Sequence, residues 1–181
     1  YIVEGFVVDA AYGRPGDVIN GRPVLGGREW LKAHRDDVVA VCGIGAPEVR
    51  RRLVQAAALD GVRFASVIHP SVISTRWVTV GSGSVICAGA ILTNQIRLGE
   101  HVHVNLGCTI GHDTVVEAFA TFSPGVHLSG NVTVREGAYV GTGASVIEKC
   151  EIGAWSVIGA GAAVVRSIPA DSTCVGVPAK V

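Results

Sequence analysis

The stretch VNLGCTIGHDTVVEAFATFSPGVH, Val104 to His127, decides the fold of this chain. Written in groups of six it reads VNLGCT, IGHDTV, VEAFAT and FSPGVH, and every group opens with a branched aliphatic residue or a phenylalanine. The fifth residue of each group is small or β-branched. The fourth is often a residue such as Gly or Asp that tolerates a left-handed backbone. A hexapeptide period of this kind is typical of a parallel β-helix.

The same register extends outward in both directions, from Ile68 to Pro169, and Ser74 is the only exception at the first position. Each group supplies a short strand and a bend, so three groups make one triangular coil and about six coils stack. The first-position side chains are expected to fill the axis, with the small fifth-position residues beside them. Hydrogen bonds between neighbouring coils would then satisfy the backbone of a Gly-rich chain.

Residues 1–65 follow a different pattern, in which apolar strands alternate with helices. The runs IVEGFVVDA and DVVAVCGIG read as strands, whereas GREWLKAHRD and APEVRRRLVQAAALDG read as helices. Alternation of this kind predicts a small, Rossmann-like α/β domain with a parallel sheet. The fold class is therefore mainly β: residues 66–181 form a left-handed β-helix, preceded by an α/β domain over 1–65. That domain is expected to be truncated, because the chain starts with Tyr1 and lacks Met.

Composition excludes several classes of function. The formal net charge of the 181 residues is zero, which argues against nucleic acid or an anionic membrane as the main partner. No apolar run reaches the roughly 18 residues of a membrane span. Five cysteines without a C-x-x-C pair predict reduced thiols in a cytoplasmic protein, and no metal site is expected. Cys108 and Cys150 stand at the small fifth position and are interpreted as core.

The repeat resembles that of the left-handed β-helix hexapeptide acyltransferases. The phrases GFVVDA, GRPVLGG and FASVIHPS and the ending IPADSTCVGVPAKV are similar to one branch of them. That branch contains sialic-acid O-acetyltransferases and N-acetyltransferases of nucleotide-linked 4-amino sugars. The resemblance implies a homotrimer with acetyl-CoA in the groove between subunits. Of the acidic pair that follows the second strand in the branch, only Asp9 matches, which makes Asp9 a candidate substrate-binding residue.

His112 is the candidate catalytic base. It occupies the third position of its six, where a side chain points outward, and the residues one coil away are Asn94 and Gly130, so the repeat does not require a histidine there. The segment from Asn105 to Asp113 resembles the catalytic segment of the family. A histidine can take the proton that an amine or hydroxyl loses as it attacks a thioester, and Asp113 can stabilise the imidazolium. Asn105 is the candidate for orienting the acceptor.

The remaining candidates follow from the 18-residue coil. Gly130 lies directly above His112 and matches the oxyanion-hole position of the family, so its amide N–H could stabilise the developing charge. Pro124, Thr142 and Ala160 form a row along one edge, along which a pantetheine arm could lie. Thr121, Gly130, Thr142 and Ala160 are the expected acetyl-CoA contacts. Each of these candidates has a competing interpretation, in which it is a turn residue without catalytic function. This applies to His112, Asp113, Asn105, Gly130 and the row.

Three functions remain open on these residues. The first is acetyl transfer from acetyl-CoA to the amino group of a nucleotide-linked sugar for surface-polysaccharide synthesis. The second is O-acetylation of sialic acid or a related sugar hydroxyl. The third is a non-catalytic β-helix that binds or scaffolds, which the outward His112–Asp113 pair disfavours. The sequence GIG at Gly43–Gly45 is interpreted as a strand-to-helix turn rather than as a nucleotide loop.

Overall fold

The computed structural model describes all residues, 1–181, and its internal contacts divide the chain into two units. The first unit comprises residues 1–40 and 52–64, and the second comprises residues 41–51 and 65–181. A single boundary near residue 65 was expected from the sequence. The segment 41–51 instead groups with the β-helix, because the buried Arg50 bonds to the coils.

The first unit is a small α/β structure with a three-stranded sheet in the order β1-β3-β2. Its elements are β1 (Phe6–Val7), β2 (Val18–Ile19), β3 (Arg22–Gly26) and α1 (Arg28–Ala33). Strand β1 pairs with β3 in parallel, whereas β2 and β3 form an antiparallel hairpin. The expected all-parallel sheet is therefore wrong, since the sequence pattern missed the hairpin.

The expected strand over residues 37–45 does not form either. Only an isolated parallel bridge joins Ala40 to Phe64. The carbonyls of Ile44 and Gly45 accept hydrogen bonds from the Arg50 side chain, so they are not available to a neighbouring strand. The GIG segment leads directly into helix α2 (Pro47–Leu59), but no strand precedes it and it is irregular, so the expected strand-to-helix turn does not form as such. Pro47 opens that helix, and Gly61 follows its end with a φ of +83°.

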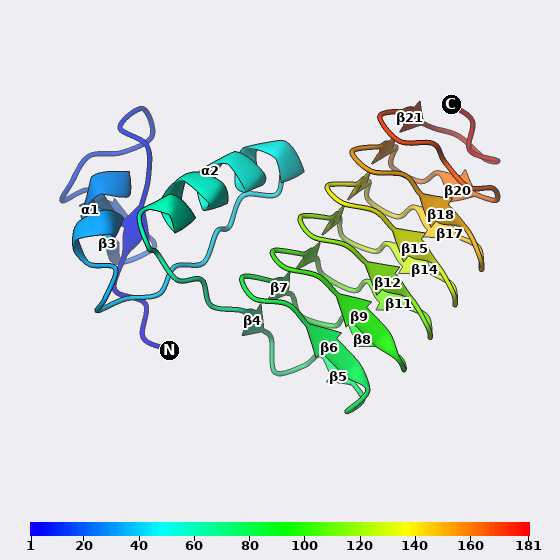
Figure 1. Ribbon diagram of the computed structural model, residues 1–181, viewed down its shortest axis with the longest axis horizontal. Coiled ribbons are helices and arrows are strands. Elements are labelled where there is room, and N and C mark those ends of the chain that lie inside the picture. The colour runs from blue at the N-terminus through cyan, green and yellow to red at the C-terminus, as the bar shows by residue number, and fades with distance from the viewer. The chain divides into compact units, whose positions relative to one another are not determined.

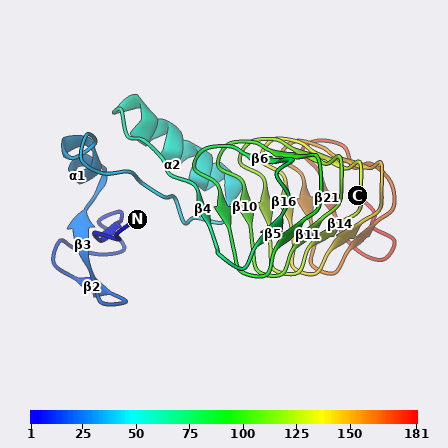
Figure 2. The ribbon, with the colours of Figure 1, turned by 90° about the horizontal axis from the view of Figure 1, so that it is seen from below.

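Residues 65–181 form a parallel β-helix with three faces, each a stack of strands that pair in parallel register. The first face holds β4 (Val67–Ile68), β7 (Val85–Ile86), β10 (His103–Val104), β13 (Thr121–Phe122), β16 (Tyr139–Val140), β19 (Val157–Ile158) and β21 (Thr173–Cys174). The second face holds β5 (Ile73–Ser74), β8 (Ile91–Leu92), β11 (Thr109–Ile110), β14 (His127–Leu128), β17 (Ser145–Val146) and β20 (Ala163–Val164). The third face holds β6 (Val78–Val80), β9 (Ile96–Leu98), β12 (Val115–Val116), β15 (Thr133–Val134) and β18 (Glu151–Ile152). Figure 1 shows the coils stacked in chain order, and Figure 2 shows the same coils from a second direction.

The hexapeptide register is confirmed residue by residue. All first-position side chains from Ile86 to Val164 are buried in one continuous core. All fourth positions from Gly83 to Gly161 have a positive φ, including His101, Asp113 and Trp155. Cys108 and Cys150 lie in the core as predicted, and all five cysteines are free thiols.

Three corners connect the faces, and the position of each site residue can be described by the corner at which it lies. We call the bend after the first face the first corner, the bend after the second face the second corner, and the bend after the third face the third corner. Corner residues of successive coils lie above one another, since partners in adjacent strands are 18 residues apart, as in Thr109 with His127. Neither helix has the length and hydropathy of a transmembrane span.

Candidate active site

The second corner carries the predicted acid–base pair. His112 follows β11, and its imidazole Nδ1 lies 2.7 Å from Oδ2 of Asp113. The side chains are 61% and 44% exposed, so both point outward from the coil. Asp113 has a φ of 57°, so it is also the left-handed residue of its bend. Asp113 therefore forms the bend and also contacts the imidazole, and its catalytic role stays a prediction.

The backbone of this corner is held by the coils on both sides. The Asp113 amide donates to the carbonyl of Asn94 at 3.0 Å, and the Asn131 amide donates to the carbonyl of His112 at 2.8 Å. With Nδ1 engaged by the carboxylate, Nε2 is the imidazole nitrogen that can accept a proton from an incoming nucleophile. The arrangement can thus act as a general base with an orienting carboxylate.

Gly130 lies against the imidazole of His112. A Cβ atom at residue 130 would stand 2.6 Å from both Cε1 and Nε2 of that ring, so any side chain there would displace the imidazole. The φ of Gly130 is not in the left-handed region, so the space beside the ring, and not the backbone conformation, favours glycine here. The Gly130 amide N–H makes no hydrogen bond within the chain, so it can donate to an oxygen beside the imidazole.

Asn105 and the row formed by Pro124, Thr142 and Ala160 lie at the first corner, not with His112. Asn105 directly follows β10 of the first face, and strand β11 separates it from His112. The three residues of the row are exposed and stand at equivalent positions of successive coils. The left-handed residue of the first bend is Gly107, with a φ of 65°, so Asn105 does not play that role. One chain therefore presents the predicted base and the predicted acetyl-CoA row at opposite edges of the second face.

Thr121 does not join the row. Its side chain is 1% exposed, its hydroxyl donates to the carbonyl of Gly45 at 2.8 Å, and it accepts from Nη2 of Arg50 at 2.9 Å. A buried hydroxyl with both partners satisfied is poorly placed for a direct contact with a cofactor, which speaks against that role for Thr121. Its observed role is to hold the segment 41–51 on the first face.

Arg50 is the centre of this attachment, and the sequence pattern missed it. The residue is fully buried, and its guanidinium donates to carbonyl oxygens of Ile44, Gly45 and Phe119 at 2.6–3.0 Å. Burial lowers the pKa of Arg50 to about 10, which leaves it charged at neutral pH. A buried charge is costly unless its hydrogen bonds are satisfied. The run of three consecutive arginines, Arg50–Arg52, was the available signal in the sequence. Three successive residues of a helix point in different directions, so one of them can face the packed side of the helix.

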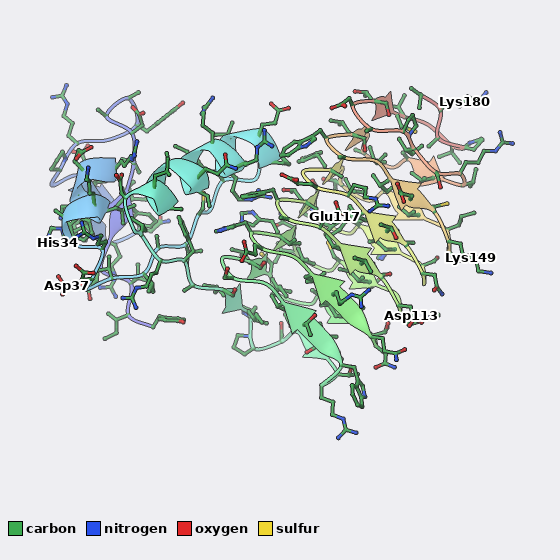
Figure 3. The ribbon with its side chains drawn as sticks, viewed as in Figure 1. His34, Asp37, Asp113, Glu117, Lys149 and Lys180 are labelled. Atoms are coloured by element: carbon green, nitrogen blue, oxygen red, sulfur yellow. The ribbon has the colours of Figure 1, made fainter.

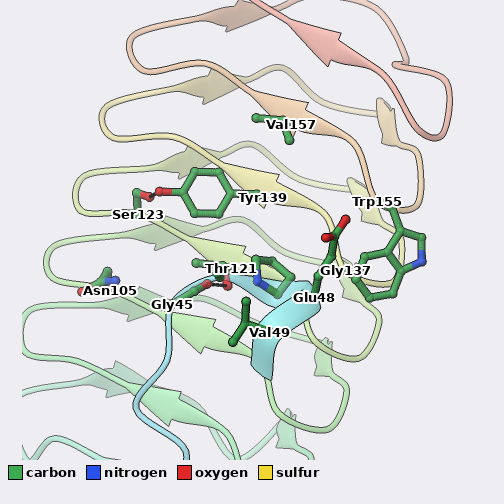
Figure 4. A pocket seen from close by; sticks show the side chains of 12 residues that line it. Gly45, Glu48, Val49, Asn105, Thr121, Ser123, Gly137, Tyr139, Trp155 and Val157 are labelled. Atoms are coloured by element: carbon green, nitrogen blue, oxygen red, sulfur yellow. Dashed lines mark hydrogen bonds between the residues drawn. The ribbon is translucent and has the colours of Figure 1, made fainter. Parts of the chain in front are cut away.

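A cavity of about 610 Å³ lies on the first face, beside the first turn of α2 (Figure 4). It extends from Asn105 and Ser123 at the first corner, past Tyr139, to Trp155 at the third corner. The sequence did not indicate this cavity, because segment 41–51 builds one wall of it from far away in the chain. Within the repeat, the feature that pointed to the cavity was Tyr139, a large side chain at the outward-facing sixth position.

The other predicted residues lie outside these two corners. Asp9 is exposed just after β1 in the first unit, where its carboxylate accepts a hydrogen bond from the Ala11 amide at 3.0 Å. No group of three or more His, Cys, Asp or Glu side chains is arranged to hold a metal ion. Figure 3 shows Asp113 and Lys149 along one edge of the coil stack, away from the cavity residues of Figure 4.

Comparison with known proteins places this geometry in context. No family model matches the chain. The chain is 30% identical over 181 residues to the GDP-perosamine N-acetyltransferase of Escherichia coli O157:H7, with 97% of this chain and 80% of that protein covered.

Solved structures agree with this similarity. A histidine-to-asparagine mutant of perosamine N-acetyltransferase from Caulobacter crescentus, in complex with CoA and GDP-perosamine, matches with a TM-score of 0.88 and 32% identity. That match covers 96% of this chain and 82% of the other. The acetyltransferase domain of PglB from Neisseria gonorrhoeae FA1090, in complex with acetyl coenzyme A, matches with a TM-score of 0.90 and 34% identity. Here 97% of this chain and 84% of the other are covered.

Proposed function

The chain belongs to the hexapeptide-repeat acetyltransferases of nucleotide-linked amino sugars, and from this premise we propose that His112 is the general base of its reaction. The enzyme transfers an acetyl group from acetyl-CoA to the amine of a nucleotide-linked amino sugar. An amine is the acceptor in the two perosamine N-acetyltransferases named above, which sets the O-acetylation alternative aside. Their enzymatic activity likewise argues against a non-catalytic scaffold.

The hydrogen bond of 2.7 Å between His112 and Asp113 carries this proposal. His112 Nε2 takes the proton from the amine as its nitrogen attacks the thioester carbonyl. Asp113 holds Nδ1–H and stabilises the imidazolium that forms. The Gly130 amide donates to the carbonyl oxygen, where negative charge develops. As the C–S bond breaks, His112 returns its proton to the departing thiolate, so the products are the amide and free CoA.

We infer that the complete site needs two subunits, and that the protein is a homotrimer. The supporting observation is that His112 and Gly130 lie at the second corner, whereas Asn105, Thr142 and Ala160 lie at the first. Residues at opposite edges of one face can meet only if the second corner of one copy faces the first corner of the next. A head-to-tail contact of this kind closes into a ring when the rotation allows it.

The product is inferred to serve glycan synthesis. Acetylation of the amine leaves the bond between sugar and nucleotide intact, so the product remains an activated glycosyl donor. Asp9 in the first unit stays a candidate for binding the nucleotide part of the acceptor.

A thiol-release assay tests the function. The purified chain, with acetyl-CoA, is offered UDP-, GDP- and TDP-linked 4-amino sugars and free sialic acid. Release of CoA with at least one nucleotide-linked amino sugar, and mass-spectrometric gain of one acetyl group on that sugar, is expected. Release with sialic acid alone would make it an O-acetyltransferase, and release with none would contradict acetyl transfer to this class of acceptor.

A further inference from the structure

The cavity on the first face combines apolar walls with a few polar groups and has no cationic side chain in its lining. Its walls combine the ring of Tyr139 and the aliphatic Val157 and Val49 with a few polar groups at the two ends. No lysine or arginine lines it, and Glu48 does, so a phosphate group would meet a carboxylate instead of a cation. The volume of about 610 Å³ lies within the roughly 300–1,000 Å³ of ordinary small-molecule sites.

Two arginines lie next to lining residues, and both are engaged: Arg50 donates to Gly45 and Thr121 from behind the wall, and Arg51 stacks on Trp155 at the third-corner end. The Arg51 guanidinium lies 4.1 Å from the centre of the Trp155 ring and 3.6 Å from the Glu136 carboxylate. These contacts hold Trp155 at the edge of the cavity. The charge of Arg51 is thus partly neutralised, which again disfavours a phosphate as the occupant.

Tyr139 supplies a directed hydrogen-bond donor at the first-corner end. Ser123, which is 4% exposed, donates its hydroxyl hydrogen to the Tyr139 oxygen at 2.9 Å, as the dashed line in Figure 4 shows. Because that phenol oxygen already accepts a hydrogen bond, its own hydrogen is free to bond to a ligand. Asn105 lies at the same end, and its side-chain amide makes no hydrogen bond within the chain.

The wall opposite Tyr139 is rigid before any ligand arrives. Arg50 and Thr121 tie Gly45 to the coils by hydrogen bonds of 3.0 and 2.8 Å. Moving Gly45 away from the coils would remove one hydrogen-bond partner from a buried guanidinium, which is costly. A cavity with fixed walls and oriented hydroxyls discriminates between ligands that differ by one hydroxyl group, because an unmatched donor loses its partner.

We propose that this cavity receives the pyranose ring of the nucleotide-linked acceptor, and that the Tyr139 hydroxyl, oriented by Ser123, selects for an oxygen substituent on that ring. The inference rests on the proposed function, because the cavity reaches Asn105 at the first corner, the corner that also carries the row formed by Pro124, Thr142 and Ala160. The apolar ring of Tyr139 suits the face of a pyranose, and the polar end suits its hydroxyls.

Steady-state kinetics with Tyr139→Phe test the proposal, using the acceptor that the thiol-release assay identifies and analogues that each lack one ring hydroxyl. Wild type should prefer the complete acceptor to one of the deoxy analogues by about 10-fold or more in kcat/KM. Tyr139→Phe should lose about 10-fold on the complete acceptor and little on that analogue, with the KM for acetyl-CoA unchanged. Ser123→Ala should show a smaller loss of the same preference. Thr173→Val removes an exposed hydroxyl from the same face outside the cavity and serves as the matched control.

Calorimetric binding of a GDP- or UDP-linked amino sugar to His112→Ala separates this inference from the catalytic role of His112. Adding Tyr139→Phe should weaken the Kd by about 10-fold whether or not turnover is detected. An unchanged Kd, or an equal loss with every analogue, overturns the proposal. A raised KM for acetyl-CoA would assign the cavity to the cofactor, and loss of the trimer in sedimentation would assign it to a subunit contact; either result also overturns it.

Discussion

At the scale of single residues, His112 is expected to control rate without controlling stability. His112→Ala should lower kcat by about 10²–10⁴-fold, the usual range for the loss of a general base. The melting temperature should change little, because the side chain is 61% exposed and its removal leaves no cavity. Turnover with acetyl-CoA and the acceptor, measured beside a thermal melt, checks both parts.

Two neighbouring variants serve as comparisons for His112→Ala. Ile110→Ala, two residues earlier, removes a first-position side chain that is 1% exposed and should cost about 2–5 kcal/mol of unfolding free energy. Asp113→Asn should be milder than His112→Ala in kcat, since asparagine tolerates the φ of 57° and the imidazole remains. A His112→Ala variant with near-normal turnover and a greatly lowered melting temperature would show that the histidine is a turn residue.

Gly130 offers a test of how closely the imidazole must be placed. Gly130→Ala keeps the backbone N–H but puts a methyl group 2.6 Å from Nε2, so the ring must move. A displacement of this size is expected to lower kcat by about 10²-fold. Gly43→Ala is the control, because a Cβ there meets no atom within 4 Å and the φ is not left-handed. Unchanged turnover in Gly130→Ala would mean that the ring is not held where catalysis uses it.

At the scale of elements, the attachment of segment 41–51 to the coils should weaken in mild acid. Burial, with the nearby Arg50 charge, lowers the pKa of His103 to about 4, and burial also lowers the pKa of His101. The folded pKa of His103 lies below the unfolded value of about 6.5. Its contribution to stability is therefore complete above pH 6.5 and is lost as pH falls toward 4.

The size of this effect can be measured by urea unfolding at two pH values. Between pH 7.5 and pH 5 the contribution of His103 should fall by about 2 kcal/mol. His103→Gln should remove that part of the pH dependence, whereas His69→Gln, an exposed histidine of the first coil, should not. Identical pH dependence in wild type and His103→Gln would place the acid sensitivity elsewhere.

At the scale of the whole molecule, the two separated corners predict complementation between inactive variants. His112→Ala removes the base at the second corner, and Ala160→Trp blocks the predicted acetyl-CoA row at the first. If each site takes one corner from each of two subunits, trimers refolded from an equal mixture should recover about a quarter of wild-type activity. No recovery, or a stable monomer in sedimentation at micromolar concentration, would contradict the shared site.

The hexapeptide period by itself determined the β-helix, the core and the outward corner position of His112, because every coil repeats the same environment at the same phase. The length of one coil, 18 residues, also predicted that Gly130 lies above His112 and that Pro124, Thr142 and Ala160 form a row. A period gives no information on what packs against the outer faces. Only the tertiary structure could therefore bring Arg50 to Thr121, 71 positions later, and create the cavity beside Tyr139.

The hairpin β2–β3 is a local feature, because its two-residue loop is Asn20-Gly21 and both residues have a positive φ. Asn-Gly is a strong short-range hairpin signal, which an interpretation based on apolar runs alone overlooks. The path of residues 43–45 is fixed instead by hydrogen bonds from Arg50 and Thr121 to Gly45. The separation of Asn105 from His112 follows from the period, because the two residues belong to successive groups of six with strand β11 between them. The two residues are only seven positions apart, but strand β11 lies between them and carries the chain from the first corner to the second. Local pattern determines which residues face outward, whereas the folding of the coil decides which of those residues can reach one substrate.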